Sequence, residues 1–358
     1  MKRLIEVTAK LFVCLVLAGT ASTALPATFD LPPDGVDVVG SISTVTAAFD
    51  DTLIDLAEKH GFGYEDMVRA NPGVNPWVPG EGTEIVLPGR FVLPAGPRTG
   101  IVLNIAEYRL YYYPQPKAGE PAQVLTFPIS IGRQDWETPL GLTKVVQKVV
   151  NPAWYPPKSV REEHAADGRP LPSVVPAGPD NPLGTRAMRL GLPGYLIHGT
   201  NRPAGVGMRV THGCLRMFPK DVEFLFELVA VNTPVRIVNE PVKIGWDGDE
   251  LVLEAHPVLA SGPTVTSDVP LGDPEKTEEL VSVTDGVEAA GEPEAAEVFS
   301  APAKDPLTFA TEQFIVATAE RAGELDWSLV ERAIEKADGM PVTVGAGIKN
   351  AATSAAFE

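Results

Sequence analysis

The spacing of apolar and polar residues divides the chain into a central β-rich region and smaller helical regions. From residue 98 to residue 241, short runs of β-branched and aromatic residues alternate with Pro, Gly and Asn, which is typical of a mainly antiparallel β domain. The strands predicted from these runs span residues 100–103, 110–113, 124–131, 142–150, 195–197 and 235–238. We interpret Tyr111–Tyr113 as one half-buried strand rather than a stacking surface. The pattern therefore predicts a mainly β protein.

Two other regions show the periodicity of helices. Asp51–Thr52 precede apolar positions at helical spacing, and Asn71–Pro72 end a second short helix, with a strand expected on each side. This order predicts a small α/β unit over residues 43–90. Towards the C-terminus, residues 307–340 carry two apolar helical stripes, with Asp326 as the cap of the second helix. We expect a short helical segment there, which packs on itself or docks a partner.

The first 24 residues have the three parts of a secretory signal peptide. Lys2 and Arg3 give a basic start, residues 11–18 are apolar, and Ser22–Ala24 offer small residues for cleavage. The apolar run is shorter than the roughly 20 residues that span a bilayer, so no membrane span is expected after cleavage. A lipid anchor on Cys14 is disfavoured because a bulky residue precedes it. We predict export to the periplasm.

The formal net charge of the chain is −18. This charge argues against nucleic acid as a partner, because binding to phosphate needs a basic surface. Much of the acidity lies in residues 261–306, which are also rich in Pro. Such a segment cannot bury enough apolar surface to offset its conformational entropy. We predict that it is a disordered linker.

Cys214 is the only cysteine left once the signal peptide is removed, which is unusual in an exported protein. A cysteine nucleophile reacts as its thiolate and needs a base, which His198 at the end of a predicted strand can supply, and the ion pair would hold the sulfur ready. Gly213 lets the backbone approach a developing oxyanion. Arg216 offers a permanently charged guanidinium group that can donate two hydrogen bonds to a substrate carboxylate. These residues predict a cysteine acyl-transfer enzyme.

Each of these residues alone also has a structural interpretation. Cys214 fits a small buried hydrophobic residue equally well, and His198 fits a hydrogen-bonded residue at a strand end. A zinc site made of His198, His212 and Cys214 is a further alternative, since imidazole and thiolate bind zinc. It is disfavoured because the sequence has no second cysteine pair and no HExxH motif. We expect no metal.

The runs His198–Asn201 and Gly207–Met217, with Thr138–Gly141, Asn151–Trp154 and Asn181–Gly184, resemble the catalytic signature of the L,D-transpeptidase family. The resemblance covers residues 98–241 and implies a β-sandwich catalytic domain, with residues 242–260 as an extension that packs on it. It implies that Cys214 is the nucleophile and His198 the general base. It further implies oxyanion or orienting roles for Gly213, His212 and Gly199, and substrate contacts for Arg216, Thr211 and Trp154.

Residues 43–90 resemble the LysM domain, a module that binds peptidoglycan. Joining a glycan-binding module to a transferase raises the local concentration of its substrate.

The two resemblances together imply an enzyme that attacks the diaminopimelate carbonyl of a tetrapeptide stem and releases D-alanine. The acyl group would pass to an amine of another stem or of an outer-membrane lipoprotein. No metal or organic cofactor would be needed, and carbapenems would acylate the thiol. Two alternatives stay open, an L,D-carboxypeptidase that uses water as acceptor and an inactive scaffold that only binds peptidoglycan.

Overall fold

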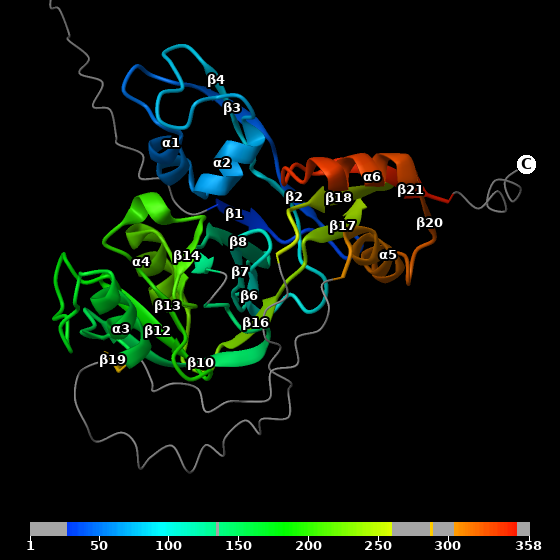
Figure 1. Ribbon diagram of the computed structural model, residues 1–358. Coiled ribbons are helices and arrows are strands. Elements are labelled where there is room, and N and C mark those ends of the chain that lie inside the picture. Colours follow the sequence, from blue (N-terminus) through cyan, green and yellow to red (C-terminus); the bar gives the residue numbers. More distant parts are fainter. Residues whose placement is uncertain (1–26, 134–135, 260–286, 289–303, 349–358) are drawn as a thin grey trace, which may run out of the picture.

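The computed structural model describes residues 27–133, 136–259, 287–288 and 304–348 (Figure 1). The predicted signal peptide lies outside the described residues, and so does most of the predicted acidic linker. Within the described part of the chain, no helix is both long enough and apolar enough to cross a membrane.

The predicted catalytic region, residues 98–241, forms one curled nine-stranded sheet together with strand β1 (Figure 1). Its strand order is β1-β8-β7-β6-β16-β10-β12-β13-β15. The bounds of the strands are β1 (Ala27–Asp30), β6 (Gly100–Asn104), β7 (Arg109–Tyr113), β8 (Gln123–Pro128), β10 (Gly141–Val150), β12 (Arg186–Leu190), β13 (Leu196–His198), β15 (Leu215–Arg216) and β16 (Pro234–Val238). The prediction of a mainly β protein is confirmed.

Both faces of this sheet are buried at strand β7. Leu110 and Tyr112 point into a core covered by helix α4 (Pro219–Leu228), whereas Tyr111 and Tyr113 point into a second core on the opposite face. The three tyrosines are at most 6% exposed. The prediction of a half-buried strand was therefore wrong, because the sheet has an apolar layer on each side.

The N-terminal unit has the strand–helix–helix–strand order that its residue pattern predicts. Strand β3 (Ser43–Thr46) pairs antiparallel with β4 (Glu84–Leu87), and helices α1 (Leu53–His60) and α2 (Tyr64–Ala70) lie between them in the chain. Thr52 caps α1: its hydroxyl accepts from the Asp55 amide at 3.0 Å, and the Asp55 carboxylate accepts from the Thr52 amide at 3.2 Å.

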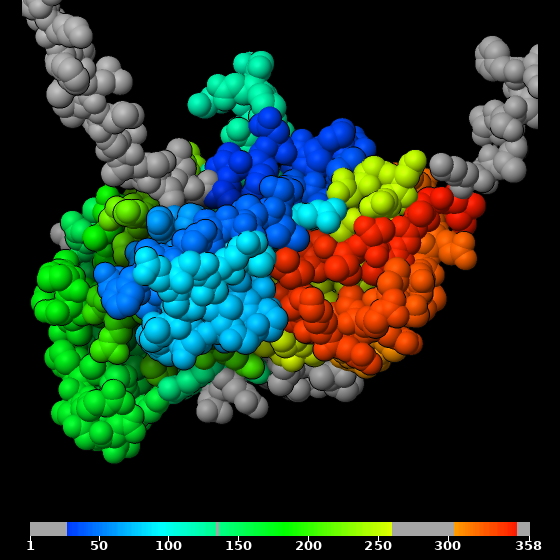
Figure 2. All heavy atoms as spheres, turned by 90° about the horizontal axis from the view of Figure 1, so that it is seen from above, coloured from blue at the N-terminus to red at the C-terminus, as the bar shows by residue number. Residues whose placement is uncertain are grey.

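This N-terminal unit shares a hydrophobic core with the catalytic sheet and is not a separate domain on a linker. Leu53 and Met67 of the helices belong to the same apolar cluster as Tyr111 of β7. A short ribbon of β2 (Val38–Gly40) and β5 (Arg90–Val92) connects the two parts. Figure 2 shows the unit, in blue and cyan, lying against both the green catalytic region and the orange and red C-terminal region.

The C-terminal region is a third unit rather than a helical segment alone. Its four-stranded sheet has the order β17-β18-β21-β20, and two helices pack on it. The bounds are β17 (Val242–Asp247), β18 (Glu250–Ala255), α5 (Pro306–Ala317), β20 (Gly323–Leu325), α6 (Trp327–Lys336) and β21 (Val342–Gly347).

Two domain predictions therefore need correction. Residues 242–260 were expected to pack on the catalytic domain as an extension, and their strands also form half of this C-terminal sheet. Residues 307–340 hold the two expected helices, with Asp326 capping α6, but also strand β20 between them. The sheet was not predictable because β20 has three residues and β21 pairs with β18 across a long linker.

A buried ionic network joins the catalytic sheet to the C-terminal unit. The ammonium of Lys243 lies 2.6 Å from Glu107 and 3.0 Å from Glu254, and all three side chains are 1% exposed. Tyr111 donates to Glu107 at 3.0 Å, and His256 lies 2.7 Å from Glu254. Lys243 is therefore the positive centre that makes the burial of two carboxylates tolerable.

Lys243→Met should lower the free energy of unfolding by about 3–5 kcal/mol, because it leaves two buried carboxylates without their cation. Urea unfolding followed by circular dichroism measures the change. The control is Lys336→Met, since this lysine pairs with Asp338 but is 67% exposed, and it should change stability by less than about 1 kcal/mol. Equal losses in the two variants would contradict the assignment.

Candidate active site

The two strands β13 and β15 bring the predicted nucleophile and base to one face of the sheet. They are parallel neighbours in which Ile197 pairs with Leu215 and His198 pairs with Arg216. Side chains alternate between the faces of a strand. Ile197 and Leu215 enter the main core, so His198 and Arg216 lie on the other face. Cys214, one residue before Leu215, shares that face with them.

The thiol of Cys214 lies in an apolar setting. The side chain is half-buried and packs against Leu183 and Leu196, with Trp154 in the same cluster. Its sulfur lies 3.5 Å from the carbonyl oxygen of Gly194. Burial raises the pKa of the thiol to about 11, although a backbone hydrogen bond from Leu196 and the charge of Arg216 act in the opposite direction. The group is therefore a thiol at neutral pH.

His198 is buried and held in one tautomer. Its Nδ1 lies 2.6 Å from the carbonyl oxygen of Gly199. Since a carbonyl only accepts hydrogen bonds, Nδ1 carries the proton and Nε2 keeps a free lone pair. Burial, helped by the positive charge of Arg216, lowers the pKa of the imidazole to about 3.

The resting pair is therefore neutral. The sequence had suggested a thiolate–imidazolium ion pair, but burial disfavours the charged form of both groups. A base in such an arrangement would receive the proton during attack, rather than before the substrate binds.

Gly213 is required by the shape of the turn that carries Cys214. Its φ is +95°, and a Cβ at this position would lie 2.9 Å from the ring of Tyr195. The Gly213 carbonyl accepts from the Thr138 hydroxyl at 2.9 Å. Because the peptide bond is planar and trans, the Cys214 amide points the opposite way. No hydrogen bond from the Gly213 or Cys214 amide occurs among the described residues, so both can serve an oxyanion.

Arg216 retains an unused positive charge beside the thiol. Its Nε is buried without a hydrogen-bond partner within the described ranges. The guanidinium lies against the loop at Gly205, where an added Cβ would be 3.4 Å from Nη1. A cation in this state suits a carboxylate ligand.

Thr211 has a different place from the one expected. It is 3% exposed, and its hydroxyl donates to the carbonyl of Cys214 at 2.6 Å. The side chain therefore fixes the turn around the nucleophile instead of presenting itself to a substrate. Trp154, in strand β11 (Trp154–Tyr155), is half-buried beside Cys214, where it can line a binding surface.

His212 faces helix α3 (Lys158–Ala166). Its Nε2 lies 3.2 Å from Glu163, which also pairs with Arg133 at 2.5 Å. The ring stacks edge-on against Trp136, with 5.1 Å between centroids. The imidazole is therefore part of the contact that holds α3 in place.

The metal-ligating atoms of His198, His212 and Cys214 do not converge. Within the described part of the chain, the one convergent group of this kind is Glu107, Glu254 and His256. There the Lys243 ammonium already contacts both carboxylates.

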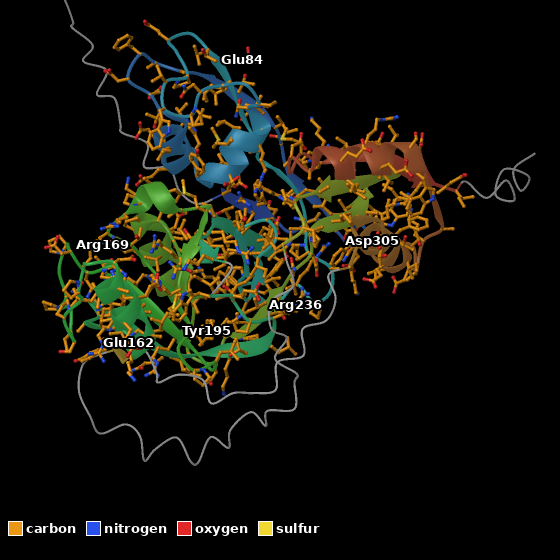
Figure 3. All side chains as sticks on the ribbon, in the orientation of Figure 1. Glu84, Glu162, Arg169, Tyr195, Arg236 and Asp305 are labelled. Carbon is orange, nitrogen blue, oxygen red and sulfur yellow. The ribbon has the colours of Figure 1, made fainter. Side chains whose placement is uncertain are left out.

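Three residues near the site could not be predicted from their residue type alone. Thr138 orders the Gly213 peptide, Glu163 orders His212, and Tyr195 packs on the Gly213 turn. Figure 3 shows Tyr195 and Glu162 of α3 on the side of the catalytic region that faces away from α1 and α2. Of the three, only Thr138 lies within a motif that resembles the family signature, so that motif was the only sequence signal for any of them.

A family model of the L,D-transpeptidase catalytic domain matches residues 98–237. The chain is 41% identical over 249 residues to the probable L,D-transpeptidase YbiS of Escherichia coli, with 68% of this chain and 80% of the relative covered. The chain belongs to the L,D-transpeptidase family. It is also 36% identical over 328 residues to the probable L,D-transpeptidase ErfK/SrfK of Salmonella typhimurium, where the coverage is 90% and 93%.

Among solved structures, L,D-transpeptidase 3 of Mycobacterium tuberculosis covers 57% of this chain and 94% of its own, with 19% identity and a TM-score of 0.29. Membership in the L,D-transpeptidase family makes the chain a transpeptidase, an enzyme that transfers acyl groups. The family model matches only from residue 98 onward and does not include residues 43–90. The LysM resemblance therefore stays a prediction.

Alkylation of Cys214 by iodoacetamide should accelerate about tenfold per pH unit from about pH 7 to about pH 10, because only the thiolate reacts and its pKa is raised to about 11. An ion pair would instead give a plateau across this range. His198→Ala is the control: since the imidazole is already neutral there, the slope should not change. Mass spectrometry of the intact protein measures the rate, and a plateau in the unmodified protein would refute the neutral pair.

Proposed function

We propose that the protein is a periplasmic peptidoglycan L,D-transpeptidase in which Cys214 is the nucleophile and His198 the general base. The observation that carries the proposal is the register of β13 and β15, which puts the sulfur and the imidazole on the same face. A base with a free Nε2 on the same face as a thiol fits the arrangement that nucleophilic acyl transfer requires.

In the first half of the reaction, the sulfur attacks the carbonyl carbon of diaminopimelate while Nε2 of His198 takes the S–H proton. The negative charge that develops on the carbonyl oxygen is stabilised by the amides of Gly213 and Cys214, each worth about 3 kcal/mol in comparable sites. As the bond to D-alanine breaks, His198 returns the proton to the leaving amine. A thioester on Cys214 remains.

In the second half, an acceptor amine loses a proton to His198 and attacks the thioester. The amide product leaves, and the proton restores the thiol. A neighbouring stem peptide and an outer-membrane lipoprotein both offer such an amine. The apolar wall of Leu183, Leu196 and Trp154 around the sulfur favours an amine over water.

Substrate binding follows from charge and shape. The guanidinium of Arg216, whose Nε has no hydrogen-bond partner among the described residues, provides a partner for a carboxylate of the stem. In the N-terminal unit, Phe49 and Trp77 are 78% and 64% exposed. They lie on the two loops joined by the hydrogen bond from the Leu53 amide to the Pro76 carbonyl, at 2.8 Å. Exposed aromatic rings on such loops support glycan binding, as expected of a LysM domain.

Cys214→Ala should reduce turnover of a purified disaccharide tetrapeptide by about 10⁴-fold or more, as loss of the nucleophile does in other acyl transferases. It should also abolish the mass increase that meropenem causes in the intact protein. Chromatography and mass spectrometry of the muropeptide products measure turnover.

The products also separate the alternatives. Cross-linked dimer, or stem joined to a lipoprotein peptide, supports the transferase. Tripeptide as the only product, even with excess acceptor amine, would identify an L,D-carboxypeptidase. If Cys214→Ala changes nothing and meropenem adds no mass, the chain is a scaffold that only binds peptidoglycan.

A further inference from the structure

The N-terminal unit touches the catalytic region at the loop between the base and the nucleophile. The start of α2 meets the loop that follows the short helix η1 (Pro203–Gly205). The Tyr64 amide donates to the Val206 carbonyl at 3.0 Å, and the Glu65 amide to the Gly207 carbonyl at 3.4 Å. These are backbone bonds between two units that are far apart in the sequence.

The contact is too close for any side chain. A Cβ added to Gly63 would lie 2.8 Å from the Cα of Gly207, and a Cβ added to Gly207 would lie 2.3 Å from the Cα of Gly63. Two glycines therefore let the backbones meet directly. Such an approach fixes the position of the loop more tightly than contacts between flexible side chains would.

A buried ion pair fixes the same end of α2 to the sheet. Asp66 accepts from Arg109 of β7 at 2.5 Å, and the two side chains are 10% and 2% exposed. Asp66 also accepts from the Gly63 amide at 3.0 Å. The start of α2 is therefore anchored to β7, and cannot move with the loop.

From this loop, hydrogen bonds continue to the reacting groups. The Gly205 carbonyl accepts from the Ser130 hydroxyl at 2.7 Å, and the backbone of Ser130 bonds to that of Arg216 in both directions, at 2.8 and 3.1 Å. On the other side of Gly207, strand β14 (Arg209–Thr211) ends at Thr211, which donates to the Cys214 carbonyl. Each end of the loop thus leads to one residue of the site.

We propose that the N-terminal unit is a positioning element of the active site, and that the Gly63–Gly207 contact holds the loop so that Arg216 and the Cys214 turn keep their reactive geometry. The proposal rests on the proposed function. A unit that served only as a tether would raise the local substrate concentration and leave the chemistry untouched. The shared core and the backbone contact favour support over tethering.

Gly63→Ala tests the contact directly. Gly63 has φ −81° and ψ 161°, which alanine adopts without strain, so the clash with Gly207 is the main change. We expect kcat on a soluble tetrapeptide stem without glycan to fall about tenfold to a hundredfold, as for a displacement of about 1 Å in an active site. KM should change less than about twofold, and binding to insoluble peptidoglycan should be unchanged. The control is Lys59→Ala, an exposed residue of α1, which should match the unmodified protein.

A second pair of variants isolates the hydrogen bond. Tyr64 is the first residue of α2, a position that tolerates proline. Tyr64→Pro removes the amide that donates to Val206, whereas Tyr64→Ala keeps it. The proline variant should acylate with meropenem at least about threefold more slowly than the alanine variant. Hydrogen exchange should rise in residues 203–211 and stay unchanged in β6 and β7, which shows that the fold is intact.

The outcomes separate this proposal from the proposed function. If Gly63→Ala and Tyr64→Pro acylate as fast as their controls, the unit does not position the site and the proposal is overturned. If the unmodified protein does not react with meropenem, and its turnover of the stem peptide does not depend on Cys214, the proposed function itself fails. A loss confined to insoluble peptidoglycan, with unchanged kcat on the soluble stem, would show a tether.

Discussion

The parallel pairing of β13 with β15 is the constraint on which the site depends. A shift of one residue between them would exchange the two faces of a strand. Cys214 would then point into the main core with Ile197, away from His198. The register is specified by that core, because Ile197 and Leu215 must both be buried. The reactive face is thus fixed by the apolar residues of the opposite face.

Burial of the pair has a chemical consequence. The thiol and the imidazole are each more stable uncharged in this setting, so the unoccupied site does not hold a reactive thiolate. In the proposed mechanism, proton transfer would accompany attack on the carbonyl, and the negative charge would move to the carbonyl oxygen, where amide groups can stabilise it. In the proposed reaction, the same apolar surroundings would limit access of water to the thioester. Low resting reactivity and the proposed preference for an amine would therefore have one physical cause.

The sequence predicted the parts of the molecule that depend on local pattern. The β-rich region, the two helices of the N-terminal unit and the family signature around Cys214 were all predicted. Helix α3 was not, since Val160 is its only buried residue and leaves no apolar stripe. Glu163, the residue of α3 that contacts His212, was missed for the same reason. The neutral state of the pair was also missed, because a sequence motif carries no information on burial.

The two-sided burial of β7 explains why the N-terminal unit and the catalytic region share one core. Residues 98–241 alone would expose Val102, Tyr111 and Tyr113, which now lie in the core shared with α1 and α2. Exposing an apolar face of that size in water is unfavourable. Some unit must therefore cover it, and the unit that does so has a fixed orientation relative to Cys214. If that unit binds glycan, the sheet itself sets the distance between the bound glycan strand and the stem that reacts. A rigid cover would then select stems by their position along the glycan, which a flexible tether could not do.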